Sequence, residues 1–328
     1  GSCCECCGSK TCEILKGKAI ANDIIENGGD YLLDTSPALL PSWYNHSEVL
    51  RGQEYFHKNV FSMFVGMLSG LLTLLTVPSI LHVLRMTNRS SAPLTAYKRY
   101  LGTITNVVSW YESDLRNPNS KGRQSILSVR GQHFAASQAH GPITQKDMAL
   151  TQFGFIGFAI ISSKKLGLNG DQAGLIHLWR VIGHLLGIQD RGSAKCTEAV
   201  CKELVERIFG PSLDKPPKYF THMSKSLING VWPIIPFLSY ACALEQTRRL
   251  CNLSPKRVPT MLQPLFYLQL AVHWLLNFNF LTYFLRLFLN TQIWVTLFLQ
   301  TLRYPLLVYM KFGVTSFEYK IEKSYNIK

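Results

Sequence analysis

A long stretch without charged residues limits what this chain can fold into. From Asn59 to Leu84 the sequence contains no Asp, Glu, Lys or Arg. A stretch of this length is long enough to cross a bilayer, and it is equally typical of a buried helix in a large helical domain. Gly66, Gly70 and Pro78 interrupt it. We expect a buried core helix, although length alone does not separate the two structures.

The overall composition favours a membrane neighbour over a nucleic acid. Of the 328 residues 47% are hydrophobic and only 16% are charged, yet Lys and Arg exceed Asp and Glu by 34 to 20. Typical soluble domains carry about 25% charged residues. A basic excess suits either an anionic membrane surface or a nucleic acid. Because no nucleic-acid-binding motif is present, we expect no nucleic-acid partner.

A second apolar stretch lies near the C-terminus. Leu265–Leu285 is uncharged and rich in aromatic residues. It could span a bilayer, lie in the membrane plane, or form an ordinary core helix. His273, Asn277 and Asn290 would need polar partners in lipid. We expect this part of the chain to contact a membrane.

Composition divides the chain into four parts. We expect a polar, Cys-rich leader at 1–30, a helical domain at 31–260, hydrophobic membrane-associated helices continuous with the core at 261–312, and a basic tail at 313–328. Five of the nine cysteines lie in the first twelve residues. Their spacing lacks the gap of a zinc knuckle, so S-acylation is the better interpretation.

The patterning between these ends predicts a mainly α-helical protein. We expect helices at 93–112, from about 125 to 140, and from about 171 to 187 and 197 to 209. Thr144 and Asp147 form a capping-box pattern before a further helix that ends at Gly167. Strand signals are scarce.

Two small clusters could carry chemistry, whereas the motifs of zinc proteases, nucleotide-binding enzymes and serine hydrolases are absent. In the first cluster Arg130 and His133 are three residues apart and share a helix face. Such a pair could bind a haem, with the imidazole on the iron and the guanidinium on a propionate. The alternative is a surface His beside an Arg.

The second cluster is Arg99 with Thr103, four residues apart on one face of the preceding helix. Its surroundings are apolar, and an Arg directed into them needs a partner. The alternative is an Arg that extends to solvent.

The two clusters together resemble the latex-clearing-protein or rubber-oxygenase family, to which the membrane-bound oxygenase of mycophenolic acid biosynthesis is related. The family pattern is an Arg, a Thr four residues later, and then an Arg-x-x-His that supplies the proximal haem ligand. Here these positions are Arg99, Thr103, Arg130 and His133. The resemblance runs from about Asn59 to Asp190 and includes the stretches 141–155 and 177–190.

The resemblance implies an all-α, globin-reminiscent core around one haem b. The implied reaction is oxidative cleavage by O2 of a carbon–carbon double bond in an isoprenoid, a terpenoid or another lipophilic polyene, giving carbonyl products. His133 would hold the iron and Arg130 a propionate, while Arg99 and Thr103 would line the distal pocket as catalytic residues.

Two positions depart from the family pattern. Gly102 stands where latex-clearing proteins have a Lys that caps the iron, and Ser137 stands where they have a second Arg. These departures keep a second hypothesis open: a membrane-associated isoprenoid- or lipid-binding protein of the same fold without redox activity. His177 and His184 are about two helical turns apart, ~10.5 Å, so we expect a pocket wall there rather than a metal pair.

Overall fold

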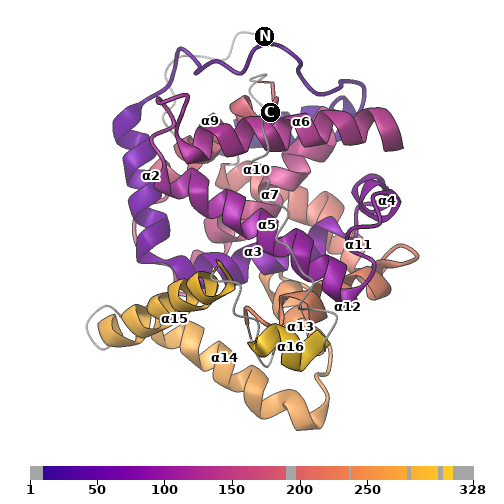
Figure 1. Ribbon diagram of the computed structural model, residues 1–328, viewed down its shortest axis with the longest axis vertical. Helices are drawn as coiled ribbons and strands as arrows, with labels where there is room; N and C mark the ends of the chain where they lie inside the picture. Colours follow the sequence, from indigo (N-terminus) through magenta and orange to yellow (C-terminus); the bar gives the residue numbers. More distant parts are fainter. Residues whose placement is uncertain (1–9, 190–196, 236–237, 279–281, 302–305, 313–328) are drawn as a thin grey trace.

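The computed structural model describes residues 10–189, 197–235, 238–278, 282–301 and 306–312 (Figure 1). Their regular structure is helical, and the single β-bridge among them joins Leu32 to Thr144. The prediction of an all-α protein is therefore confirmed. The first nine residues, with Cys3, Cys4, Cys6 and Cys7, and the basic tail at 313–328 lie outside the described residues.

The described residues form sixteen α-helices. They are α1 (Lys10–Glu26), α2 (His46–Lys58), α3 (Val60–Leu74), α4 (Pro78–Met86), α5 (Pro93–Glu112), α6 (Lys121–His140), α7 (Gln145–Ile161), α8 (Ser163–Leu166), α9 (Ala173–Leu185), α10 (Glu198–Leu204), α11 (Gly210–Asp214), α12 (Phe220–Val231), α13 (Tyr240–Leu250), α14 (Gln263–Leu275), α15 (Tyr283–Thr301) and α16 (Leu306–Phe312). A π-helix at Val205–Phe209 and a 3₁₀-helix at Thr260–Leu262 complete the described elements.

The uncharged stretch at 59–84 forms two helices at a large angle to each other. Most of α3 is buried, and α4 starts at Pro78 after a bend of 93°. Proline suits the first turn of α4 because its missing N–H is not needed there. In the described part of the chain, no single helix is long and apolar enough to cross a membrane. The expectation of a buried core helix is confirmed for α3, whereas α4 is a separate helix in which only Leu81 is buried.

Glycines bring α3 and α7 into close contact at the centre of the fold. A Cβ atom at Gly70 would lie 1.8 Å from the Gly154 carbonyl oxygen, so only glycine fits at this crossing. The core around it is aromatic. Phe56 stacks on Tyr111 with ring centres 3.8 Å apart, and the Trp179 indole N–H donates to the Tyr111 hydroxyl at 2.5 Å.

The helix ends follow the sequence signals closely. Helix α5 has the expected bounds, and the capping box of Thr144 with Asp147 starts α7. The stretch after it ends at Gly167, whose φ is 66°. Helix α6 begins four residues earlier than expected, because the Ser120 side chain caps it by accepting from the Arg123 N–H.

Two N-terminal segments pack on the domain. Within the expected leader, α1 lies against α10, with Ala21 and Ile24 buried. Residues 31–45, which we call the strap, then run over α6 and α9 at one end of the molecule (Figure 1). The α14–α15 hairpin projects from the opposite end (Figure 1).

Candidate functional site

His133 lies in the second half of α6, where the helix separates from the core. The first half of α6 contains buried residues as far as Ile126, and the second half contains none. Nevertheless the ring nitrogen Nδ1 of His133 is shielded from solvent and has no hydrogen-bond partner. Burial, and secondly the nearby charge of Arg99, lower the pKa of His133 to about 4. The imidazole is therefore neutral at pH 7, as a metal ligand must be.

Two glycines show that α5 and α6 diverge towards His133. Where the helices are close, a Cβ at Gly122 would lie 2.5 Å from the Ser109 carbonyl oxygen. Near the other end of α5, a Cβ at Gly102 would meet no heavy atom within 4 Å. Gly102 is flanked along α5 by Arg99 and Thr103, and Arg99 is near enough to His133 on α6 to lower its pKa, so these residues share one region of the molecule. We call it the α5–α6 wedge.

The Arg99 side chain is held at the wedge by the C-terminal end of α4. Its Nη1 donates to the Thr87 hydroxyl oxygen at 3.2 Å. Burial lowers the pKa of Arg99; among its charged or titratable neighbours Tyr100 acts in the opposite direction and Arg89 in the same direction. The sequence analysis did not identify Thr87. It could only indicate that a half-buried Arg99 needs a polar partner.

The helices that bound the wedge carry no neutralising acids. The sequence has no Asp or Glu at 55–111 or at 115–146, which covers α4, α6 and all of α5 except its last residue. In the described part of the chain, the charge that acts on Arg99 comes from another Arg rather than from a carboxylate. The wedge therefore suits a ligand that brings negative charge.

Thr103 lies one turn along α5 from Arg99. Its hydroxyl donates to the Arg99 carbonyl oxygen at 3.1 Å, a bond within the same helix. The Thr103 oxygen keeps acceptor capacity, while its proton is engaged locally. Ser137, at the other departure from the family pattern, accepts from the Ile143 N–H at 2.9 Å and thereby fixes the turn after α6.

Arg130 points to the strap. Its Nη2 donates to the carbonyl oxygens of Asp34 and Ser36, and its Nη1 donates to that of Leu185 at 3.3 Å. A haem propionate would have to compete with these carbonyls for the guanidinium. Its role as a propionate anchor stays a prediction, and the structure adds a role in holding α6 to the strap and α9.

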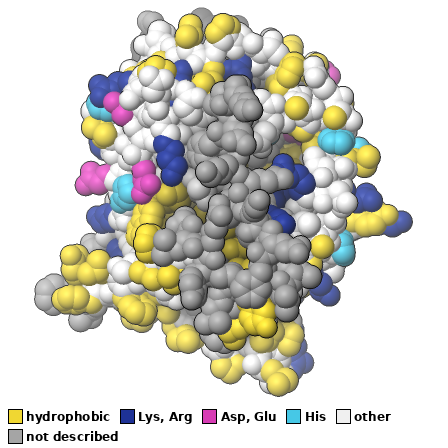
Figure 2. Space-filling model, viewed as in Figure 1, with side chains coloured by type: hydrophobic (Ala, Val, Ile, Leu, Met, Phe, Trp, Pro, Cys, Tyr) yellow, Lys and Arg dark blue, Asp and Glu magenta, His cyan; other side chains and the backbone are white. Residues whose placement is uncertain are grey.

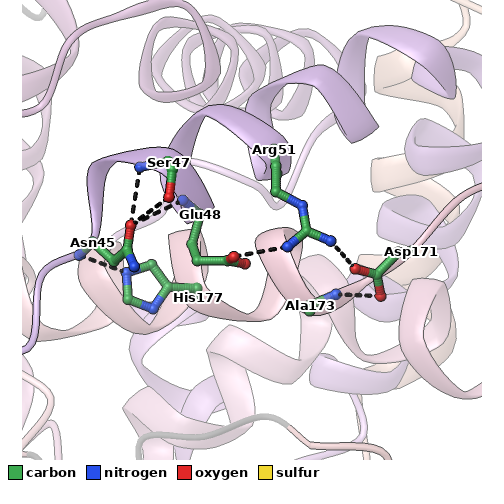
Figure 3. Close-up of polar contacts among 7 residues, drawn as sticks. All are labelled: Asn45, Ser47, Glu48, Arg51, Asp171, Ala173 and His177. Carbon is green, nitrogen blue, oxygen red and sulfur yellow. Dashed lines mark hydrogen bonds and ion pairs between the residues drawn. The ribbon is translucent and has the colours of Figure 1, made fainter.

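His177 and His184 lie against the strap. The Nε2 of His177 accepts from the Asn45 N–H at 3.1 Å, beside the Arg51 ion pairs to Glu48 and Asp171 (Figure 3). Both imidazole rings pack edge-on against the Trp43 ring at about 6 Å. These contacts fit a helix anchor. Among the described residues, no group of three His, Cys, Asp or Glu side chains could hold a metal ion.

The residues at the wedge fit one axial ligand for a haem iron. A neutral imidazole with an unpartnered, shielded nitrogen is available, because His133 makes no hydrogen bond through Nδ1. A Cβ atom at Gly102, on the same helix as Arg99, would meet no heavy atom within 4 Å, and the positive charge of Arg99 suits carboxylates. A single protein ligand is sufficient for a haem, since the porphyrin supplies the others.

One comparison with known proteins, that with family models, identifies a family. Residues 55–275, more than half of the chain, match the family model described as ER-bound oxygenase mpaB/B'/Rubber oxygenase, catalytic domain. The matched region includes α5 and α6 with all four residues of the sequence pattern, and it ends with α14. Searches of curated proteins and of solved structures find no match. The chain belongs to the mpaB and rubber oxygenase catalytic-domain family.

Proposed function

We propose that the chain is a haem b-dependent oxygenase that cleaves a carbon–carbon double bond of an isoprenoid, a terpenoid or another lipophilic polyene. Family membership supports the oxygenase class. The observation that carries the haem assignment is the neutral, unpartnered His133 imidazole beside the open wedge. In the proposed reaction one alkene and one O2 give two carbonyl groups, so both oxygen atoms appear in the products.

Each residue of the wedge has a separate task in this proposal. The haem, when bound through His133, supplies the redox chemistry that lets O2 react with an alkene. Arg99, fixed by Thr87, keeps a cationic N–H donor at the wedge. Thr103 offers a hydroxyl oxygen one turn away. The apolar residues of α5 exclude water from the reacting groups.

An absorption spectrum tests the cofactor. The purified chain should show a Soret band that shifts on reduction with dithionite, and His133→Ala should lose it. His140→Ala, on the same helix, is the matched control and should keep the haem. A spectrum without a Soret band after expression with ample haem, or full haem content in His133→Ala, would contradict the assignment.

The second candidate is a lipid- or isoprenoid-binding protein of the same fold without redox activity. Arg130 favours it, because the guanidinium expected on a propionate donates to three backbone carbonyls. Product formation from a polyene under O2 separates the candidates. Consumption of O2 with new carbonyls supports the enzyme, and binding of the polyene without consumption supports the carrier.

We also place the protein at an intracellular membrane. The name of the matched family includes an ER-bound oxygenase, and a lipophilic polyene is concentrated in bilayers. Fractionation of cells that express the full chain tests this placement. The protein should sediment with the membranes, and its recovery in the supernatant after a high-speed spin would contradict the proposal.

A further inference from the structure

The outward face of the α14–α15 hairpin is apolar. Its Trp274 side chain is 62% exposed and Phe284 78% exposed. Their neighbours Leu268, Tyr283, Phe288 and Phe298 are also exposed. Figure 2 shows hydrophobic side chains gathered over this projecting end of the molecule. Scattered apolar residues are normal on a protein surface, but a continuous apolar face marks an interaction site.

The inward face of the same hairpin contains the polar side chains of the two helices, among buried apolar ones such as Ile293 and Leu297. His273 pairs through Nδ1 with the Leu166 carbonyl oxygen at 3.0 Å. Asn277 donates to the Lys164 carbonyl oxygen at 2.9 Å, and Asn290 accepts from the Phe61 N–H at 3.0 Å.

Arg286, the only charged residue of the hairpin helices, is also turned inward. It donates to Asn59 Oδ1 at 2.7 Å and to the Gly167 carbonyl oxygen at 2.9 Å. Polar groups and buried apolar side chains such as Ile293 and Leu297 therefore attach the hairpin to the domain, while its outward face is apolar where a surface helix is usually polar. Such a pair of helices is stable where its outer surroundings are hydrocarbon.

The dimensions favour a position in the membrane plane over a span. Helix α14 has 13 residues and α15 has 19, and no described helix meets the requirements of length and hydropathy for a span. Exposed Trp and Tyr side chains, here Trp274, Tyr267 and Tyr283, are typical of the boundary between headgroups and acyl chains.

The charges around the hairpin favour anionic lipid over a protein partner. The sequence contains no Asp or Glu from Gln246 to Phe317. Lys256 and Arg257 are exposed directly before the hairpin, and Lys164 is exposed on α8, which packs on α14. Lysine and arginine side chains next to an apolar face complement the negative headgroups of phosphatidylserine or phosphatidylinositol.

We propose that the α14–α15 hairpin inserts its outward face into one leaflet of an anionic membrane, in the plane of the bilayer and without crossing it. This inference rests on the proposed membrane association and does not depend on haem or catalysis. Helix α15 lies beyond the residues that match the family, so the family match does not itself assign this surface.

Vesicle binding by the full chain tests the proposal with a matched pair of variants. Leu268 on the hairpin and Leu39 on the strap have similar exposed fractions, 61% and 68%. Leu268→Asp should bind phosphatidylcholine–phosphatidylserine vesicles at least about tenfold more weakly than the wild type. Leu39→Asp should bind as the wild type does, and vesicles of phosphatidylcholine alone should bind the wild type more weakly.

Trp274 gives a second measurement that does not require a loss of binding. Lipids brominated on their acyl chains should quench part of the tryptophan fluorescence, and Trp274→Phe should remove most of that quenching while vesicle binding persists. Unchanged vesicle binding by Leu268→Asp would overturn the hairpin as the contact, and membrane association would then belong to another segment. A dimer in light scattering that Leu268→Asp dissociates, together with no vesicle binding by the wild type, would assign the face to a second copy of the chain instead.

Discussion

His133 on α6 and Arg99 on α5 lie close enough for the guanidinium charge to lower the pKa of the imidazole. The sequence separates them by more than thirty residues, and the antiparallel arrangement of the two helices brings them together. One neutral nitrogen base therefore stands beside one cation at an open wedge. This pair defines the candidate site more directly than either short motif does.

Removal of the Arg99 guanidinium should separate haem binding from turnover. Arg99→Ala should keep the Soret band of the wild type and lose most activity, because His133 remains while the cationic donor at the wedge is gone. Lys98→Ala, the adjacent exposed cation, is the control and should retain activity. Loss of haem in Arg99→Ala would instead make this side chain a cofactor anchor.

The divergence of α5 and α6 predicts opposite effects for the same substitution. Gly102→Ala should stabilise the fold by about 0.5–1 kcal/mol, because alanine favours the helix and its Cβ meets nothing. Gly122→Ala should destabilise it by about 1–3 kcal/mol, because its Cβ collides with the Ser109 backbone. Denaturant unfolding of the two variants measures the difference, and equal effects would show that the helices do not diverge.

Arg130 should stabilise the chain even without haem. Its donors satisfy backbone carbonyls of the strap and of α9, so Arg130→Ala should lower the free energy of unfolding of the haem-free chain by about 1–3 kcal/mol. Arg116→Ala, which removes an exposed ion pair to Asp114, should change the free energy of unfolding much less. If Arg130→Ala leaves the stability of the haem-free chain unchanged but weakens haem binding, Arg130 acts only as a propionate anchor.

Acid should weaken the attachment of the hairpin through His273. Burial lowers the pKa of His273 from its usual 6.5 to about 4, although the hydrogen bond to the Leu166 carbonyl oxygen acts in the opposite direction. The unfolded chain therefore binds a proton at higher pH than the folded chain does. Stability should be complete above pH 6.5 and fall between pH 6.5 and 4, by up to about 3 kcal/mol.

The control for this titration is His273→Gln, whose amide can still donate to the Leu166 carbonyl oxygen. The melting temperature of this variant should depend less on pH between 6.5 and 4 than that of the wild type. Parallel pH profiles of the two proteins would assign the acid sensitivity to other groups.

Local signals predicted the helices well, because caps and glycines act within a few residues. The Thr144–Asp147 capping box and the Gly167 terminus are found as expected. The bend after α3 was harder to predict: Pro78 is compatible with either a kink or a new helix, and only packing against the domain decides. The hydrogen bonds of His273 and Asn277 in the apolar C-terminal stretch were not predictable either, because their partners lie more than a hundred residues away in the sequence.

The candidate site was predictable in its residues and less so in its contacts. The spacing of Arg99, Thr103, Arg130 and His133 follows from the sequence pattern. The Thr87 partner of Arg99 and the strap carbonyls bound by Arg130 are contacts between separate segments. Periodicity in one segment carries no information about such contacts.

The strap also sets a limit on how the protein can be divided. The family match begins at Tyr55, inside α2, and the strap that accepts hydrogen bonds from Arg123 and Arg130 lies before it. A fragment cut at that boundary would leave Arg123 of α6 without its Ala38 acceptor and Arg130 with only the Leu185 carbonyl, and it would expose the α9 surface under Trp43. The unit that folds is therefore larger than the unit that is shared with the family, and any domain excised for study has to begin before residue 31.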